Sequence, residues 1–285
     1  MTIRNQKYNA LSIGGNKKMD NFKTFLVSEN LAPNTVSAYL VAINGYFKQF
    51  EEINKKNLLA WKSSLIENFK AKTVNLKIQA INKYLDYIKR PSLKIKSVKV
   101  QQRLFLENVI SDADYSFFKR KLKQEQNKEW YFIVRFLAAT GARISELIKI
   151  KVEHVESGFI DLYTKGGKIR RIYIPRLLRN EALIWIKEEL HIETGYIFMN
   201  RFKERITSRG ISQQLKNYAV KYGIDTKVVY PHSFRHRFAK NFLDKYNDIA
   251  LLADLMGHES IETTRIYLRK TASEQQAIVD KIVTW

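Results

Sequence analysis

The sequence contains no cysteine among its 285 residues. This absence excludes disulfides, thiolate nucleophiles and cysteine metal sites, and it fits a reducing compartment. The five histidines are too scattered to suggest a zinc site. No stretch approaches 18 consecutive apolar residues, and the first residues lack the apolar run of a signal peptide. We therefore expect a cytoplasmic protein without a membrane segment, a bound metal or a cofactor.

Acidic residues are scarce in comparison with basic ones. The chain has 28 Asp and Glu against 50 Lys and Arg, which gives a net charge of +22 and a pI near 9.9. Residues 1–100 hold 18 basic and 6 acidic side chains, a net of +12, so the N-terminal part is the denser cation. Such a charge indicates a polyanionic partner, with nucleic acid as the first candidate. An anionic membrane surface is less favoured, because the basic residues are interleaved with apolar and acidic ones.

The N-terminal third has the pattern of a small helical domain. Residues 1–18 are polar and basic and read as a flexible leader. Between residues 19 and 90, apolar side chains recur at intervals of three and four, which predicts four helices, and Asn34 is placed to cap the second of them. Lysines lie between the apolar positions of the last helix, and we take Lys72 and Lys77 as candidate DNA contacts.

Residues 91–103 interrupt the helical pattern. They contain a proline and alternate apolar with basic residues, which predicts an extended linker. Its Lys96 and Lys99 are further candidates for contact with a DNA backbone.

The rest of the chain, 104–285, predicts a larger helical domain with one β-hairpin. Phe159–Tyr163 and Ile169–Ile174 have the composition of strands and flank the glycine-containing turn Thr164–Lys168. A short apolar helical pattern beginning near residue 271 predicts a tail helix. The expected fold class is mainly α with a small β-sheet in the C-terminal domain.

Four polar groups stand out between Pro231 and Leu268. His232 and Arg235 are three apart and so point the same way from one helical turn. Gly257 can end the preceding apolar helix and leave His258 at its exposed end. Tyr267 follows nine residues later. Upstream, the sequence Ala-Thr-Gly-Ala-Arg-Ile-Ser-Glu-Leu at 139–147 places Arg143 just after a glycine break.

These positions, in this order, resemble the catalytic domain of tyrosine recombinases, the phage-integrase and Xer-like family. The resemblance rests on ATGxRxSEL, HxxR, Gly-His and a tyrosine nine residues on, and it covers about residues 105–275. The sequence APNTVSAY at 32–39 is also similar to the helical, SAM-like core-binding domain that precedes the catalytic domain in the family. The resemblance implies a two-domain clamp that binds a double-stranded DNA recombination site.

The implied reaction cleaves and rejoins DNA through a 3′-phosphotyrosyl intermediate. Tyr267 would be the nucleophile, and with an ordinary pKa near 10 it must lose its proton as it attacks. His232 is the candidate for that base. Arg143 and Arg235 would hold the phosphate through their planar cationic forks.

The remaining positions would assist this reaction. His258 would donate a further hydrogen bond to the phosphate, Glu146 would orient Arg143 or a histidine, and a hairpin lysine would protonate the departing 5′ oxygen. Lys165 matches the family position by standing before the glycine, while Lys168 can reach the same place and is otherwise a DNA contact. The implied catalytic set is Arg143, Lys165, His232, Arg235, His258 and Tyr267.

The family further implies a homotetramer on two DNA sites, associated with the nucleoid when bound. In the family the tail helix packs on a neighbouring protomer, and packing in cis is the alternative. Integration or excision and the resolution of chromosome or plasmid dimers both fit the sequence. Two other functions stay open: a type IB topoisomerase-like enzyme with similar chemistry, and a DNA-binding accessory protein that does not cut.

Overall fold

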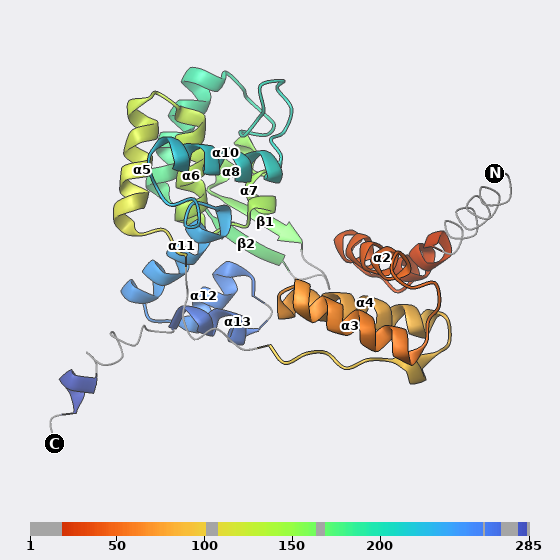
Figure 1. The fold of residues 1–285 in the computed structure, drawn as a ribbon. Coiled ribbons are helices and arrows are strands. Elements are labelled where there is room, and N and C mark those ends of the chain that lie inside the picture. The colour runs from red at the N-terminus through yellow and green to blue at the C-terminus, as the bar shows by residue number, and fades with distance from the viewer. Residues whose placement is uncertain (1–18, 101–107, 164–168, 259, 269–278, 284–285) are drawn as a thin grey trace. The chain divides into compact units, whose positions relative to one another are not determined.

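The structure is a computed structural model that describes residues 19–100, 108–163, 169–258, 260–268 and 279–283. The chain divides into two compact units, Met1–Gln102 and Arg103–Trp285. Both are built mainly from helices, and a two-stranded antiparallel sheet lies in the second (Figure 1). The expected fold class is therefore confirmed, whereas the proposed leader at 1–18 lies outside the described residues. In the part of the chain that is described, no helix has the length and apolar character needed to cross a bilayer.

The first unit is a helical bundle around an aromatic core. Its helices are residues 19–28, α2 (Pro33–Phe47), α3 (Lys55–Asn68) and α4 (Ala71–Tyr87). Their apolar faces meet because each helix repeats its apolar residues at three and four. Tyr46 of α2 and Trp61 of α3 are buried at the centre, with ring centroids 5.3 Å apart and nearly perpendicular. Such edge-to-face pairs add to the stabilisation from burial alone.

Two expectations for this unit are wrong in detail. Asn34 does not cap α2, because Pro33 occupies the first helical position and Ala32, in an extended conformation, precedes it without a side-chain cap. Proline is pre-organised for that position and needs no donor there. Leu76 of α4 is one of the recurring apolar residues that the helical pattern predicts to face inward, but it is 40% exposed.

The segment after α4 is held against the first unit by two asparagines. A short 3-10 turn, η1 (Pro91–Leu93), replaces the start of the extended linker that the sequence predicts. The Asn82 side chain then donates to the carbonyl of Ile95 and accepts from its N–H, at 2.9 and 3.0 Å. Asn75, two helical turns earlier, binds Val98 in the same two-way manner, at 2.9 and 2.8 Å. The backbone at 95–98 is therefore fixed along α4.

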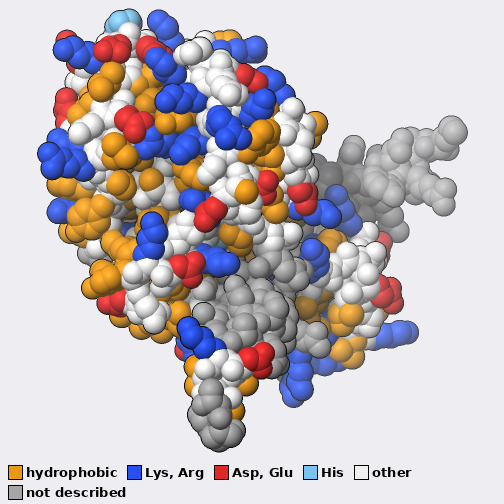
Figure 2. Space-filling view, turned by 90° about the vertical axis from the view of Figure 1, so that its left-hand side faces the viewer, with side chains coloured by type: hydrophobic (Ala, Val, Ile, Leu, Met, Phe, Trp, Pro, Cys, Tyr) orange, Lys and Arg blue, Asp and Glu red, His pale blue; other side chains and the backbone are white. Residues whose placement is uncertain are grey.

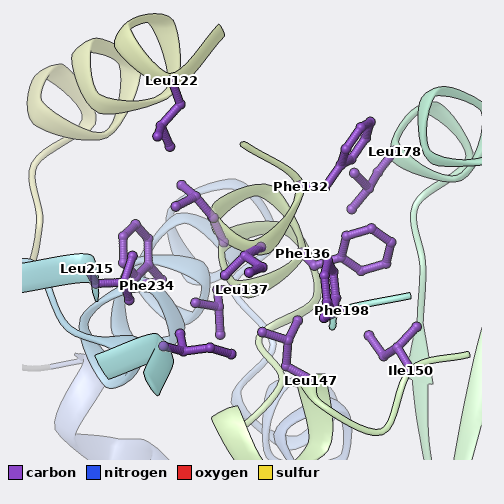
Figure 3. Close-up of a cluster of buried hydrophobic side chains, with 14 of the residues drawn as sticks. Leu122, Phe132, Phe136, Leu137, Leu147, Ile150, Leu178, Phe198, Leu215 and Phe234 are labelled. Carbon is purple, nitrogen blue, oxygen red and sulfur yellow. The ribbon is translucent and has the colours of Figure 1, made fainter. Parts of the chain in front are cut away.

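The second unit is organised around α6 (Lys128–Thr140), which is buried over most of its surface. Phe136 and Leu137 of α6 lie at the centre of the apolar cluster in Figure 3. Around them pack Leu147, Ile150, Leu178, Phe198, Leu215 and Phe234. The surrounding helices are α5 (Asp112–Gln124), α7 (Ile144–Leu147), α8 (Val152–Ser157), α9 (Arg176–Trp185) with a π-helical turn at Ile186–Leu190, α10 (Ser208–Lys221) and α11 (Pro231–Lys245).

The hairpin and the last helices complete this unit. Strand β1 (Phe159–Tyr163) pairs with β2 (Ile169–Tyr173) in the register Phe159 to Tyr173 and Tyr163 to Ile169. Helix α12 (Ile249–Met256) packs against β2 and α11, and it is followed by α13 (Ile261–Arg265) and the 3-10 turn η3 (Ile266–Leu268). These contacts bring β2, α11 and η3 around α12, where the candidate residues lie.

Candidate active site

Helix α11 carries one side of the site. Tyr230 enters it in an extended conformation and Pro231 takes the first helical position, so His232 and Arg235 both stand within the first two turns. The Arg235 side chain points inward and the residue is only 3% exposed. A buried arginine needs partners for its donors, because an unpaired buried charge is costly.

Those partners are carbonyl groups at the ends of two other helices. Arg235 donates from Nη1 to the Gly141 carbonyl at 2.5 Å and from Nη2 to the Met256 carbonyl at 2.6 Å. Gly141 follows α6 and Met256 ends α12, so the cation lies at the negative ends of both helix dipoles. Burial, followed by the charges of Arg143 and Arg170, lowers the pKa of Arg235 to about 10, which leaves it protonated at neutral pH. Arg235 thus joins α6, α11 and α12 at one point.

Arg143 approaches the same point from the start of α7. The residue precedes the helix, and its backbone N–H donates to the Glu146 carboxylate at 2.6 Å. Its guanidinium pairs with Glu146 at 2.9 Å and donates to the carbonyl of Gly257 at 3.0 Å. The Arg143 side chain is 36% exposed. Its guanidinium is therefore both oriented and accessible.

Glu146 also binds Arg170 of β2, a residue that the sequence analysis did not single out. Arg170 is 5% exposed, pairs with Glu146 at 2.5 Å and donates to the carbonyl of Leu255 at 3.0 Å. Burial alone would raise the pKa of the Glu146 carboxyl, but the charge of Arg170 and hydrogen bonds from Arg143 and Arg170 hold it below its ordinary value. The expected supporting position of Glu146 therefore corresponds to a carboxylate shared by two arginines.

Gly257 and His258 connect α12 to the cluster. Gly257 ends α12 with φ of +60°, and a Cβ there would lie 2.1 Å from Cδ of Arg170. His258 Nε2 lies 3.1 Å from Arg235 Nη2, and its Nδ1 lies 2.7 Å from Oγ1 of the buried Thr264. Since arginine only donates, Nε2 accepts and Nδ1 carries the proton. Burial, then the charge of Arg235, lowers the pKa of His258 to about 4, so the ring is neutral at pH 7.

Tyr267, on η3, lies beside this histidine. The two rings are nearly parallel, at 11° and 6.4 Å between centroids. The Tyr267 ring also packs on the small apolar cluster of α11 and α12 that contains Ala239, Leu243, Leu252 and Met256. Burial raises the pKa of the Tyr267 hydroxyl, although the charges of Arg235 and Arg143 oppose this rise. The phenol is therefore held protonated next to a cationic cluster.

The hydroxyl of Tyr267 meets His236, which the sequence analysis overlooked. His236 Nδ1 lies 3.0 Å from Tyr267 Oη. His232, the expected base, stands one turn earlier with its ring centroid 6.1 Å from that of His236. Partial burial and the charges of Arg235 and Arg143 lower the pKa of His232. The four-residue spacing of two histidines on α11 was the available signal.

The expected lysines lie elsewhere or outside the described residues. Lys165 and Lys168 fall in the segment 164–168, outside the residues that the structure describes. Lys72 and Lys77 are on α4, where the Lys77 ammonium lies 4.8 Å from the Phe69 ring. Lys96 and Lys99, in the segment after η1, are exposed. These four lysines belong to the first unit. Over the described ranges, no group of three or more His, Asp or Glu side chains is arranged to hold a metal ion.

Comparison with known families matches residues 110–274 to the phage integrase family. The chain is 27% identical over 275 residues to the tyrosine recombinase XerA of Pyrococcus furiosus, covering 92% of this chain and 93% of that one. It is 29% identical to the TnP I resolvase of Bacillus thuringiensis, covering 86% and 93%.

Solved structures show the same fold. A lambda integrase dimer bound to a COC′ core site is similar with a TM-score of 0.71 and 18% identity, covering 95% of this chain and 78% of that one. The XerH recombinase bound to its difH substrate is similar with a TM-score of 0.66 and 19% identity, covering 90% and 81%.

Proposed function

The chain belongs to the phage integrase family, the tyrosine recombinases that cleave and rejoin DNA at specific sites, and from this premise we propose that Tyr267 is its nucleophile. The observation that supports this role most directly is the position of Tyr267, against His258 and within the field of Arg143 and Arg235. Side chains that bind an anion and a hydroxyl that can attack it thus come together in one place.

In the proposed reaction, Tyr267 Oη attacks a DNA phosphorus and forms a 3′-phosphotyrosyl ester, which keeps the energy of the broken bond. Arg143 and Arg235 bind the nonbridging oxygens, where negative charge develops. Helix ends hold Arg235 and a carboxylate holds Arg143, so both cations are oriented before the substrate arrives. His258 accepts from Arg235 through Nε2 and so orients that arginine toward the same oxygens, and His232 precedes Arg235 by three residues on the same helix.

We assign protonation of the departing 5′ oxygen to a lysine of the hairpin turn, with Lys165 as the first candidate and Lys168 as the second. An ammonium suits this step because it can give up a proton to an oxygen that is gaining charge. The two lysines stand in the sequence between strands β1 and β2, whose register runs from Phe159 and Tyr173 to Tyr163 and Ile169.

Covalent trapping tests the nucleophile. The full chain is incubated with a pool of nicked duplexes whose cleaved fragment diffuses away, and protein-bound DNA is isolated and sequenced. We expect an adduct with the wild-type protein and none with Tyr267→Phe, which should still bind DNA. Tyr246→Phe is the matched control, since Tyr246 is a 59% exposed tyrosine of the same unit, and it should form the adduct. An adduct with Tyr267→Phe, or none with the wild type, would overturn the assignment.

We further propose that the first unit is the core-binding domain, that the two units close on one duplex, and that four protomers act on two duplex sites in the cytoplasm. Exposed apolar side chains near the C-terminus support docking on a neighbouring protomer, since Val279, Ile282 and Val283 are 44–59% exposed. Mass measurement on two-site DNA should give four chains for two duplexes. Ile282→Glu should reduce that assembly while leaving the binding of one chain to one half-site unchanged.

The DNA substrate that the protein requires distinguishes a site-specific recombinase from the type IB topoisomerase-like alternative. Such an enzyme relaxes a supercoiled plasmid that lacks the captured site, whereas we expect strand exchange only between two copies of that site. A pool-derived site placed twice on one plasmid, against a plasmid without it, provides the comparison.

A further inference from the structure

We propose that His236 is the general base that takes the proton from the Tyr267 hydroxyl, with His232 serving the phosphate instead. The inference rests on the proposed function, because it assigns a partner to the nucleophile named there. It begins from one contact, the 3.0 Å between His236 Nδ1 and Tyr267 Oη. This distance is within the reach of about 2.6–3.2 Å that proton transfer to a base requires.

Both members of this pair are held in place. His236 directly follows the buried Arg235 on α11, so the hydrogen bonds that fix Arg235 also fix the backbone that carries His236. Tyr267 is held by packing on the apolar cluster of α11 and α12 and by the parallel ring of His258. The contact is thus a property of two packed elements, α11 and η3.

The three histidines of the site therefore divide into two groups. His258 binds Arg235 directly, and His232 lies three residues before Arg235 on α11, a spacing that points both side chains the same way. His236 instead faces the atom that must lose a proton. Of the side chains near Tyr267 that the structure describes, His236 is the one whose ring nitrogen lies within hydrogen-bond distance of Oη.

The charges around His236 make its pKa depend on whether a phosphate is bound. Facing it are His232 and Arg235 of its own helix, His258 after α12 and Tyr267 of η3. Burial, then His232 and Arg235, lowers the pKa of His236 to about 4, so it is neutral at pH 7 and can accept. A phosphodiester bound by the arginines brings a negative charge that offsets Arg235. This raises the pKa of His236, so the base strengthens when a phosphate is in place.

The proton balance is complete. The Tyr267 proton moves to His236 Nδ1, which becomes an imidazolium, as Oη bonds to phosphorus. The bond from phosphorus to the 5′ oxygen breaks, and that oxygen takes a proton from the hairpin lysine proposed above. On rejoining, the 5′ hydroxyl returns its proton to the lysine, and His236 returns its proton to Oη.

The test uses two substitutions that differ in one property. In His236→Asn, the amide oxygen can accept the Tyr267 hydrogen bond in the place of Nδ1 but cannot take the proton; His236→Ala removes both abilities. Single-turnover adduct formation is measured across pH, with melting and DNA binding as checks on folding. We expect both variants to be slower by about 100-fold or more at pH 7, a typical loss for a general base. The deficit should shrink at high pH, where the phenol ionises unaided.

His191→Asn is the matched control, because His191 is an exposed histidine at φ of +50°, a conformation that asparagine tolerates. It should cleave at the wild-type rate. A His236→Asn protein as fast as wild type, with only His236→Ala slow, would reduce His236 to a positioning residue and overturn the proposal. A wild-type rate of adduct formation in both His236 variants would also overturn the proposal. If the wild type itself forms no Tyr267-dependent adduct, the proposed function fails rather than this inference.

Discussion

At the scale of single residues, the two arginines of the site differ in what holds them, and this difference predicts different consequences of substitution. Arg143→Lys keeps a charge but loses the planar fork, and we expect adduct formation to fall by about 100-fold or more. Because the Arg143 side chain is 36% exposed, the free energy of unfolding should change by less than about 1 kcal/mol.

Arg235→Lys should lose activity and also stability. A lysine cannot satisfy the Gly141 and Met256 carbonyls in the same geometry, and one unmet buried acceptor costs about 1–3 kcal/mol. Urea unfolding measured alongside adduct formation checks both effects. An Arg235→Lys protein with the wild-type unfolding midpoint would contradict this account of how the arginine is held.

Because Glu146 is ionised and paired with arginines, we expect the free energy of unfolding to depend on pH. Its pKa in the folded protein lies below the ordinary 4.5, so its stabilisation is fully present above about pH 4.5 and is lost as pH falls through the folded pKa. Glu146→Gln leaves the buried Arg170 without its carboxylate partner, which should cost about 3 kcal/mol at pH 7. The difference in the free energy of unfolding between Glu146→Gln and the wild type should be smaller at pH 3.5 than at pH 7.

Urea unfolding at both pH values measures this effect. Glu262→Gln is the control, since Glu262 forms an exposed i,i+3 pair with Arg265, and such pairs contribute little. A constant difference between wild type and Glu146→Gln at the two pH values would show that the carboxylate charge is not the stabilising feature.

At the scale of elements, the end of α12 fixes how the helix meets β2. Gly257→Ala would place a methyl group 2.1 Å from Arg170 Cδ at a backbone φ of +60°. The left-handed conformation alone costs about 1 kcal/mol for a residue with a Cβ, and Arg170 must also move. Because Arg143 donates to the Gly257 carbonyl and His258 follows it, we expect adduct formation to fall by more than 10-fold.

Gly195→Ala provides the comparison for that variant. Gly195 also has a positive φ, +95°, but nothing lies within 4 Å of its added Cβ. It should lose stability with little change in cleavage rate per folded molecule. Equal rates for the two variants would mean that the contact between α12 and β2 does not position the site.

Sequence patterns located most elements but not the contacts between them. Helix α6 has a clear sequence signal, because a strong apolar run is followed by Gly141, which ends the helix in a left-handed conformation. The π-helical turn after α9 has no such signal. The hydrogen bonds by which Asn75 and Asn82 hold residues 95–98 have no sequence signal either, because an asparagine on a helix surface is ordinarily solvated.

The site shows the same division. The order of Arg143, His232, Arg235, His258 and Tyr267 identified the cluster, because each stands in a local motif. Which of two histidines on α11 meets Tyr267 depends on where η3 packs, and this is set by tertiary contacts. Arg170 and Arg171 are adjacent in one strand, yet only Arg170 is buried, because the alternation of β2 turns it toward Glu146. Spacing along the sequence thus predicted which residues come together, whereas the contacts among them depend on tertiary packing.

At the scale of the whole molecule, positive charge is spread rather than confined to the site. Figure 2 shows Lys and Arg side chains dispersed among apolar ones on the face drawn, with fewer Asp and Glu. With a net charge of +22, we expect DNA affinity to fall steeply with salt, because each neutralised phosphate releases counterions. For about 6–10 phosphate contacts, the loss between 50 and 200 mM salt is about 10³–10⁵-fold.

The same charge argument separates backbone contacts from catalytic groups. If Lys72, Lys96 and Lys99 touch phosphates, each alanine variant should weaken binding equally on all sequences and reduce the salt slope by about 1. Tyr267→Phe changes no charge and should leave both slope and affinity unchanged. Titrating labelled duplex at four salt concentrations with each variant gives the slopes. If the salt slope is unchanged in all three lysine variants, these lysines do not contact phosphates. The phosphate contacts would then be made by other Lys and Arg side chains of the protein.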